Sequence, residues 1–307
     1  MSLRTLNDIL LVVCKNRRER VMMQRQVLGW VPISSTEVYR SVVGVARALE
    51  SWGIRKGDRV AILSENRPEW TITDFAALAL GAVTVPVYST QTAEQTAYIL
   101  NDSGARVIAV STKSQLEKVL MIQRHTPVEL IIVMDAVETA HAVQIQALML
   151  QGPSAPDPEF DARSASIQPD ELATIIYTSG TTGTPKGAML THGNMASNIE
   201  HSMAAFGFGT KEEVSLSFLP LSHVTARHVD FALLYRGVVL AYCPDIAHLA
   251  RALDEVQPNI YCCAARVRED PATGHPQGNG FSEESPLSMD AFRRTRSPLP
   301  DSCRHRT

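Results

Sequence analysis

Apolar residues along the first half of the chain alternate between helical spacing and short continuous runs. After the S-x-x-E pair of Ser34 and Glu37, apolar residues recur on one helical face as far as Trp52, and Gly53 ends the predicted helix. The run 59–63 is short, apolar and typical of a buried strand. The same alternation predicts helices at 68–81, 92–104 and 113–124, and strands at 83–88, 107–110 and 130–134. Pro86 is expected to break the strand at 83–88.

The second half continues the pattern after an interruption. Residues 151–168 contain Gly152 and several prolines, and they are predicted to form a linker or surface loop. The elements predicted beyond it are strands at 172–176, 188–190, 214–218 and 238–242, helices at 194–205 and 247–256, and the start of a strand at 259–262. Thr191 is the expected cap of the helix at 194–205. Short strands alternating with longer helices predict an α/β fold of mostly parallel sheets with covering helices.

The last part of the chain differs in character. Residues 264–307 show no apolar periodicity, and they contain five prolines and scattered arginines. Such a segment buries too little apolar surface to offset its ordering entropy. We therefore expect a partial domain over 1–263 and a disordered tail over 264–307, arising from a shifted reading frame or a shortened chain rather than from an evolved tail.

Composition limits the classes of function. The chain has 307 residues, 45% hydrophobic and 20% charged, and a net charge of -3, which gives no electrostatic footprint for nucleic acid. No signal peptide or transmembrane segment is predicted, because the longest apolar stretch, 75–88, is too short to span a bilayer. A cytoplasmic location is the default, peripheral membrane contact stays open, and the oligomeric state is not indicated. Five cysteines without a C-x-x-C pair and nine histidines without ligand spacing predict no metal cluster.

Candidate chemistry gathers in one loop. Residues 178–184 are all hydroxyl-bearing or glycine, and Pro185, Lys186 and Gly187 follow them between two predicted strands. Small residues leave backbone N–H groups open to an anion, hydroxyls add donors, and the lysine adds a compact positive charge. The pattern predicts a phosphate-binding hairpin loop.

Two other interpretations fit this loop less well. A Walker A loop needs glycine before its lysine and a hydroxyl after it, whereas this chain has Pro185 and Gly187 at those positions. A flexible surface loop of Ser, Thr and Gly fits the composition but not the two apolar flanks and the Pro-Lys-Gly ending. A dinucleotide-binding site is not supported, because no G-x-G-x-x-G follows the first strand.

The stretch Tyr177 to Gly187 resembles the phosphate-loop motif of the adenylate-forming superfamily. Further stretches are similar to its long-chain fatty acyl-CoA synthetase branch: A-I-L-S-E-N-R-P-E-W at 61–70, E-Q and Y-I-L-N-D-S-G-A within 94–105, and L-P-L-S-H-V at 219–224. The likeness runs from about Thr5 to about Tyr261 and covers only the front part of the family's chain.

The resemblance implies an AMP-forming ligase that uses ATP and Mg²⁺ to activate a fatty acid and then transfers the acyl group to coenzyme A. It assigns the ATP phosphates to a binding loop and its lysine, and it places the hydroxyl of Thr178 near Mg²⁺. The binding residues implied are Thr178, Ser179, Gly180, Thr181, Thr182, Gly183 and Lys186. Lys186 and His223 are the implied catalytic residues, and His223 would line the passage between nucleotide and acyl carboxylate. A hydrogen-bonded structural role for His223 remains an equal alternative.

Later motifs of the family are absent from this sequence. No Tyr-Gly and no Thr-Gly-Asp occurs in it, so the acid that binds magnesium and the aspartate that holds the ribose have no counterpart. We expect the chain to be incomplete, poorly stable and inactive alone. The alternatives are another adenylate-forming ligase, such as an aryl-CoA ligase or a peptide-synthetase adenylation domain, and a non-catalytic nucleotide-binding remnant.

Overall fold

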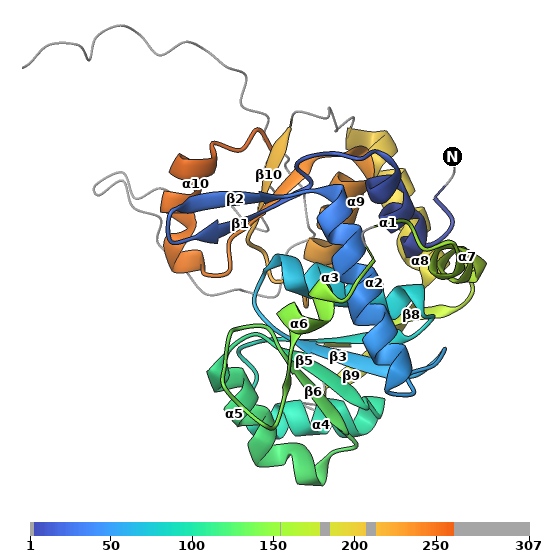
Figure 1. Ribbon diagram of the computed structural model, residues 1–307, viewed down its shortest axis with the longest axis vertical. Helices are drawn as coiled ribbons and strands as arrows, with labels where there is room; N and C mark the ends of the chain where they lie inside the picture. The colour runs from blue at the N-terminus through green and yellow to red at the C-terminus, as the bar shows by residue number, and fades with distance from the viewer. Residues whose placement is uncertain (1–2, 154, 179–184, 207–212, 261–307) are drawn as a thin grey trace, which may run out of the picture.

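The computed structural model describes residues 3–153, 155–178, 185–206 and 213–260. Its strands form a seven-stranded and a four-stranded sheet, with helices between the sheets and on their outer faces (Figure 1). This arrangement confirms the α/β class with mostly parallel sheets and covering helices.

The larger sheet has the order β7-β6-β5-β3-β4-β8-β9, and all of its neighbours are parallel except β8 and β9. Its strands are β3 (Arg59–Leu63), β4 (Val83–Val87), β5 (Val107–Val110), β6 (Leu130–Val133), β7 (Val143–Gln144), β8 (Leu172–Thr178) and β9 (Lys186–Thr191). Side chains along a strand alternate between faces. Val60 and Ile62 therefore enter the core on one face of the sheet, while Ala61 and Leu63 enter the core on the other.

Helices cover both faces of the larger sheet. Those on the face toward the smaller sheet are α2 (Ser35–Ser51), α3 (Pro68–Ala79) and α6 (Ile145–Leu150), and those on the outer face are α4 (Ala93–Ser103) and α5 (Lys113–Ile122), which continues into η1 (Gln123–His125) (Figure 1). The helix α3 is buried along its whole length, which places it in the middle of the molecule.

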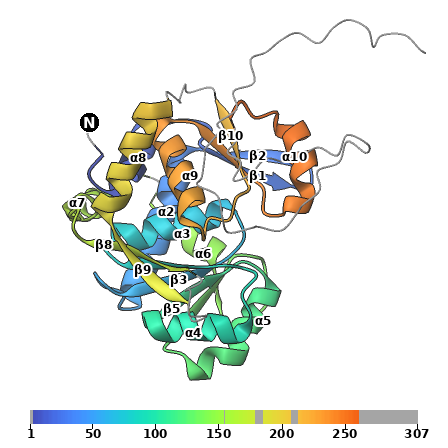
Figure 2. The ribbon, with the colours of Figure 1, turned by 180° about the vertical axis from the view of Figure 1, so that it is seen from behind.

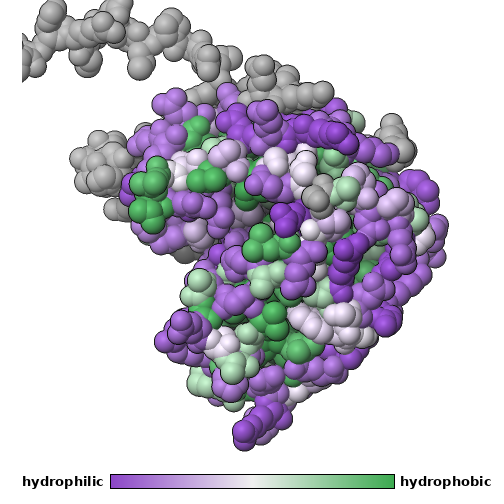
Figure 3. Space-filling view, in the orientation of Figure 1, coloured by the Kyte–Doolittle hydropathy of each residue, from purple (hydrophilic) through white to green (hydrophobic). Residues whose placement is uncertain are grey.

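The smaller sheet has the order β10-β11-β1-β2. Its strands are β1 (Met22–Gln26), β2 (Gly29–Ile33), β10 (Val214–Ser217) and β11 (Val239–Tyr242). Around it lie α1 (Leu6–Lys15), α8 (His192–Phe206), α9 (Val224–Arg236), η2 (Ile246–His248) and α10 (Leu249–Val256). Seen from behind, α8 and α9 run beside each other above the β8–β9 hairpin (Figure 2). On the face shown in Figure 3, the outline is hollowed between the two sheets, and hydrophobic residues gather near the hollow.

Two local predictions are wrong. Pro86 does not break its strand: β4 is continuous and Pro86 stands opposite Ile62 of β3. On its other side β4 meets β8 at Thr84, so Pro86 lies outside that ladder and its missing N–H costs little there.

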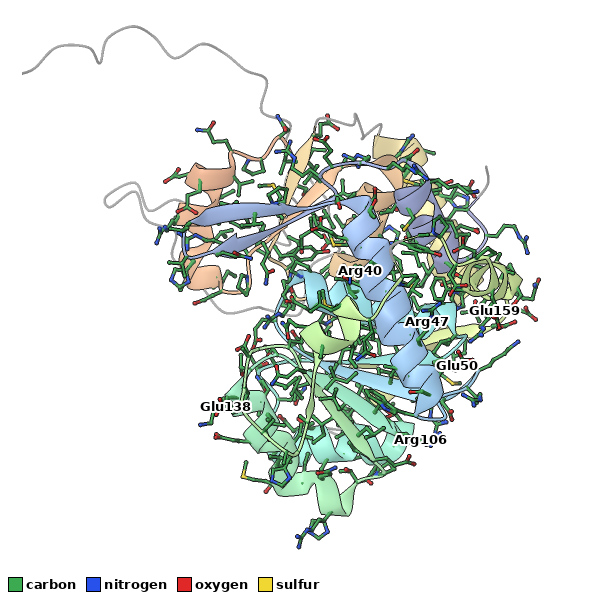
Figure 4. All side chains as sticks on the ribbon, viewed as in Figure 1. Arg40, Arg47, Glu50, Arg106, Glu138 and Glu159 are labelled. Carbon is green, nitrogen blue, oxygen red and sulfur yellow. The ribbon has the colours of Figure 1, made fainter. Side chains whose placement is uncertain are left out.

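The predicted linker 151–168 contains α7 (Pro158–Ser166). Asp157 caps this helix by accepting hydrogen bonds from the N–H groups of Glu159 and Phe160 at 3.1 and 3.2 Å. Ion pairs attach α7 to α2, where Arg47 binds Asp157 at 2.7 Å and Glu50 binds Arg163; Figure 4 labels Arg47 and Glu50 on α2.

The boundary at 263 and the disordered tail 264–307 stay predictions, because residues 261–307 lie outside the described part. In the described ranges no helix is both long enough and apolar enough to cross a membrane.

Candidate phosphate-binding site

The predicted phosphate loop lies at the tip of the β8–β9 hairpin. The two strands are antiparallel, and Thr178 stands directly opposite Lys186 where the hairpin opens into the loop. Both residues are exposed. The hairpin is confirmed, and the pairing brings two of the predicted binding residues together. Ser179, Gly180, Thr181, Thr182 and Gly183 lie outside the described residues, so their roles stay predictions.

Helix α4 contacts the residues on either side of this loop. The buried Tyr177 donates a hydrogen bond from its hydroxyl to Asp102 Oδ2 at 2.6 Å, and Tyr98 donates one to the carbonyl of Pro185 at 3.0 Å. The two tyrosine rings meet edge to face, with centroids 6.4 Å apart. Burial, followed by the bond to Asp102, raises the pKa of Tyr177, so its hydroxyl remains a donor at neutral pH. The residues on both sides of the loop are therefore hydrogen-bonded to one helix.

Gly187 allows the close approach of the two hairpin strands. A Cβ atom at this position would lie 2.7 Å from Ile175 Cγ2 and 3.2 Å from the ring of Tyr177. Packing therefore explains Gly187, because the absence of a side chain there lets the ring of Tyr177 lie across β9.

The ammonium group of Lys186 has no carboxylate partner among the described residues. The salt bridges nearest to it along the chain are those of Arg163 on α7 and of Glu171, which directly precedes β8. A lysine at the mouth of a loop of small residues keeps its charge available for an anionic ligand.

His223 lies at the other sheet, as the N-cap residue of α9. Its Nδ1 accepts a hydrogen bond from the N–H of Thr225 at 3.1 Å, so the neutral ring carries its proton on Nε2. Burial lowers the pKa of His223, which favours this neutral form. His223 therefore has the hydrogen-bonded structural role considered above, and its Nε2–H remains a hydrogen-bond donor. No described hydrogen bond joins His223 to Thr178 or Lys186.

The two other histidines near the site have structural partners. His192 is fully buried at the start of α8, and its Nδ1 accepts a hydrogen bond from the N–H of Leu6 at 3.4 Å. His228 lies within hydrogen-bond distance of Ser202 Oγ, at 3.1 Å.

Metal ligands are sparse in this region. Across the described ranges, no group of three or more His, Cys, Asp or Glu residues is arranged to hold a metal ion. Magnesium in nucleotide sites is held by one or two protein ligands together with the phosphates of the substrate. The exposed hydroxyl of Thr178 fits such a partial ligand set but does not form a site by itself.

Sequence reasoning did not single out two buried polar residues that contact the segment leading to His223. Asn66 belongs to the E-N-R-P-E-W stretch, and its side chain contacts the segment that leads to His223. Asp230 lies buried on α9, a helix that the apolar pattern did not reveal. The E-N-R-P-E-W motif was the available signal for Asn66, whereas Asp230 had none.

Curated relatives align with most of this chain. It is 37% identical over 251 residues to the long-chain-fatty-acid–CoA ligase FadD15 of Mycobacterium bovis, an alignment that covers 81% of this chain and 42% of the relative. It is 32% identical over 255 residues to the long-chain-fatty-acid–CoA ligase ACSBG2 of Xenopus laevis, covering 78% and 34%. The chain thus spans less than half the length of these relatives.

Solved structures share the fold. The N-terminal domain of FACL13 from Mycobacterium tuberculosis, bound to an inhibitor, superposes with a TM-score of 0.70 at 24% identity, covering 83% of this chain and 61% of that one. The anthranilate CoA ligase AuaEII, in complex with anthranoyl-AMP, gives a TM-score of 0.72 at 21% identity, covering 85% and 50%.

The family described as AMP-binding enzyme matches residues 12–292. That match continues past Tyr261, where the resemblance read from single motifs ended. Because it takes in the anchored β8–β9 hairpin, both sheets and the segment of His223, this chain belongs to the AMP-binding enzyme family.

Proposed function

We propose that this chain forms the ATP-phosphate-binding part of an AMP-forming long-chain fatty acid–CoA ligase. The observation that carries the proposal is the β8–β9 hairpin, in which Thr178 and Lys186 face each other at the mouth of a loop of glycine and hydroxyl residues. The names of the curated relatives favour a fatty acid over other carboxylic acids as the substrate.

In the proposed reaction, a carboxylate oxygen of the fatty acid attacks the α-phosphorus of ATP and pyrophosphate leaves. The acyl-AMP then gives its acyl group to the thiol of coenzyme A, and AMP is released. The substrate supplies the nucleophile in the first step, so the protein acts by positioning and by stabilising charge. Backbone N–H groups and hydroxyls of 178–184 bind the β- and γ-phosphates, and Lys186 neutralises part of their charge.

Magnesium, when bound, would neutralise charge that develops on the phosphates, with the hydroxyl of Thr178 as one oxygen ligand. His223 has a different part. Its Nδ1 is engaged as the cap of α9, so we assign Nε2–H to donate a hydrogen bond to the acyl carboxylate or an α-phosphate oxygen. It acts as a neutral donor rather than as a base.

Calorimetric titration with ATP and Mg²⁺ tests the binding part of the proposal. Each charge-assisted hydrogen bond is worth about 1.5–3 kcal/mol, so Lys186→Ala should weaken ATP binding roughly 10- to 100-fold. Lys113→Ala is the matched control, because Lys113 is an exposed lysine whose ammonium lies 3.9 Å from Glu117 on α5. Equal ATP affinity in wild type and Lys186→Ala would place the nucleotide elsewhere.

Pyrophosphate release tests the catalytic part. With ATP, Mg²⁺ and palmitate we expect this chain to bind nucleotide but to release no pyrophosphate, since the sequence has no Tyr-Gly or Thr-Gly-Asp motif. Turnover with benzoate or an amino acid, and not with palmitate, would favour an aryl-CoA ligase or a peptide-synthetase adenylation domain. Binding without any turnover also fits a nucleotide-binding remnant, and a longer homologous chain assayed beside it separates the two.

A further inference from the structure

The side chain of Asn66 joins two segments of the chain that lie about 150 residues apart. Asn66 follows β3 in the larger sheet, and it is buried. Its Nδ2 donates to the carbonyl of Leu219 at 2.7 Å, and its Oδ1 accepts from the N–H of Leu221 at 3.1 Å. One amide thus holds the backbone on both sides of Pro220, a residue that has no N–H of its own.

The orientation of this amide is fixed by its partners. Rotating it by half a turn would set its NH₂ group against the N–H of Leu221 and its oxygen against the carbonyl of Leu219. Only the orientation described here satisfies both partners. Asn66 therefore acts as a directional clamp on residues 219–221.

Ser217 extends the contact into the smaller sheet. Its Oγ accepts a second hydrogen bond from Asn66 Nδ2 at 3.0 Å, and it donates to Asp230 Oδ2 on α9 at 2.6 Å. A small cavity of about 10 Å³, about the room of one water molecule, lies beside this network and is lined in part by Ser217, Leu219 and Asp230. The network therefore runs from β3 through the end of β10 to α9.

Among the residues that the structure describes, none forms a salt bridge with Asp230. Tyr242 faces it from β11, and its hydroxyl lies 2.9 Å from that of Thr71. Glu69 and Asp74 lie on either side of Thr71 along α3, and Arg227, on the same helix as Asp230, is paired with Asp74 at 2.7 Å. Burial raises the pKa of Asp230 to about 7, and the hydrogen bond from Ser217 opposes that shift.

The clamped segment leads directly to His223. The N–H of His223 donates to the carbonyl of Pro220 at 2.8 Å, and its Nδ1 accepts from Thr225 in the first turn of α9. Residues 219–223 are thus held by Asn66 at one end and by the cap of α9 at the other.

We propose that Asn66 is a positioning residue, which sets the orientation of His223 through its two hydrogen bonds to the backbone of Leu219 and Leu221. Ser217 and Asp230 support the side chain of Asn66 in this position. That orientation matters for catalysis only if the proposed function holds, but the clamp itself can be measured without it. A purely structural Asn66 would contribute to stability without controlling His223.

Nuclear magnetic resonance of the full 307-residue chain, with labelled backbone amides and histidine rings, tests this. In Asn66→Ala we expect the Leu221 amide to exchange about tenfold faster or more. We also expect the His223 ring resonances to move. Asn66→Asp keeps an acceptor for Leu221 but has no donor for Leu219, so an intermediate effect is expected.

Asn101→Ala is the matched control. Asn101 on α4 is exposed and donates to the carbonyl of His125 at 3.0 Å, and its loss should change neither Leu221 nor His223. If Asn66→Ala folds and leaves both probes unchanged, the clamp does not position His223 and the proposal is wrong. If Asn66→Ala does not fold, the same two probes are measured in Asn66→Asp, and unchanged probes there would likewise show that the proposal is wrong.

Ser217→Ala tests the contribution of Ser217 and Asp230 separately from the clamp of Asn66. It removes the link to Asp230 but leaves both bonds from Asn66 to the segment. In wild type, the Leu221 amide resonance should follow the titration of Asp230 near pH 7, and in Ser217→Ala and in Asp230→Asn this dependence of the Leu221 amide should be absent. A titration that persists unchanged in Asp230→Asn would remove Asp230 from the network. ATP affinity measured in parallel tests the hairpin alone. A loss of ATP binding would contradict the proposed function, whereas unchanged Leu221 and His223 resonances would contradict the clamp.

Discussion

Single residues in the interior bind protons differently from the same residues in an unfolded chain. His192 and Asp230 are both buried, and burial favours the neutral form of each. For a histidine the neutral form is the deprotonated one, and for a carboxyl it is the protonated one. The two residues should therefore change the free energy of unfolding in opposite directions as the pH rises.

His192 should weaken the fold in acid. Burial, and then the nearby charge of Arg227, lowers the pKa of His192 to about 4, so the unfolded chain binds the proton first. Its contribution is present above pH 6.5 and is lost as the pH falls toward 4, by up to about 3 kcal/mol. Urea unfolding between pH 4 and 7 should show this slope in wild type and in the exposed control His141→Gln, and a flatter one in His192→Gln. Parallel curves for all three would contradict the assignment.

Asp230 should act in the opposite sense. Its folded pKa of about 7 lies above the unfolded value of 3.8, so its stabilising contribution is present below pH 4 and is lost as the pH rises through 7. Asp230→Asn removes this dependence, and the variant should gain up to about 4 kcal/mol relative to wild type between pH 4 and 8. The comparison uses urea midpoints, with the exposed Asp254→Asn as control. A constant difference between wild type and Asp230→Asn would show that Asp230 is charged throughout.

At the scale of elements, a buried ion pair joins α3 to α9. Arg227 Nη2 lies 2.7 Å from Asp74 Oδ1 and 3.1 Å from Thr84 Oγ1, and the side chains of Arg227 and Asp74 are fully buried. The guanidinium carbon also lies 5.7 and 5.4 Å from the centroids of Trp70 and Phe231. Removing one member of such a pair leaves an uncompensated charge in the core.

Arg227→Met should therefore lower the free energy of unfolding by about 3–5 kcal/mol. The double variant Asp74→Leu/Arg227→Met should recover a large part of that loss, because no buried charge remains. Lys113→Met, which breaks an exposed pair on α5, should change stability by less than about 1 kcal/mol. Chemical denaturation of the four proteins measures the differences. A double variant as unstable as Arg227→Met would show that the pair acts through shape rather than charge.

Two parts of the fold could not be predicted from the pattern of apolar residues, each for its own reason. Helix α9 buries Arg227, His228 and Asp230, so its buried face does not show an apolar stripe. The β1–β2 hairpin turns at Val27 and Leu28 instead of at the usual Asn-Gly or Asp-Gly pair, and both side chains are exposed. Helices with a capping box and an apolar face, such as α2 and α4, were predictable.

The site was predictable to a similar extent. The β8–β9 hairpin follows from two apolar runs around a glycine-rich loop, and its lysine was named from the sequence. What the sequence could not supply was the set of contacts between distant segments. The bond from Tyr177 to Asp102 and the clamp of Asn66 on Leu219 join residues 75 and 153 positions apart, and only the folded topology brings them together.

At the scale of the whole molecule, the proposed site draws on both sheets. The larger sheet carries the β8–β9 hairpin, and the smaller sheet carries the segment of His223. Helix α3 and the side chain of Asn66 connect the two. The outer edge of β10 meets Ile260 in a single parallel bridge from Ser215.

Hydrogen exchange measured by mass spectrometry, with and without ATP and Mg²⁺, tests most directly whether this hairpin binds the nucleotide. We expect slower exchange in peptides that cover 172–191, and no change in peptides that cover β5 and β6 at 107–133. Lys186→Ala should abolish the effect at the same ATP concentration. Slower exchange at another segment, with the hairpin unchanged while ATP binds, would contradict the proposed site.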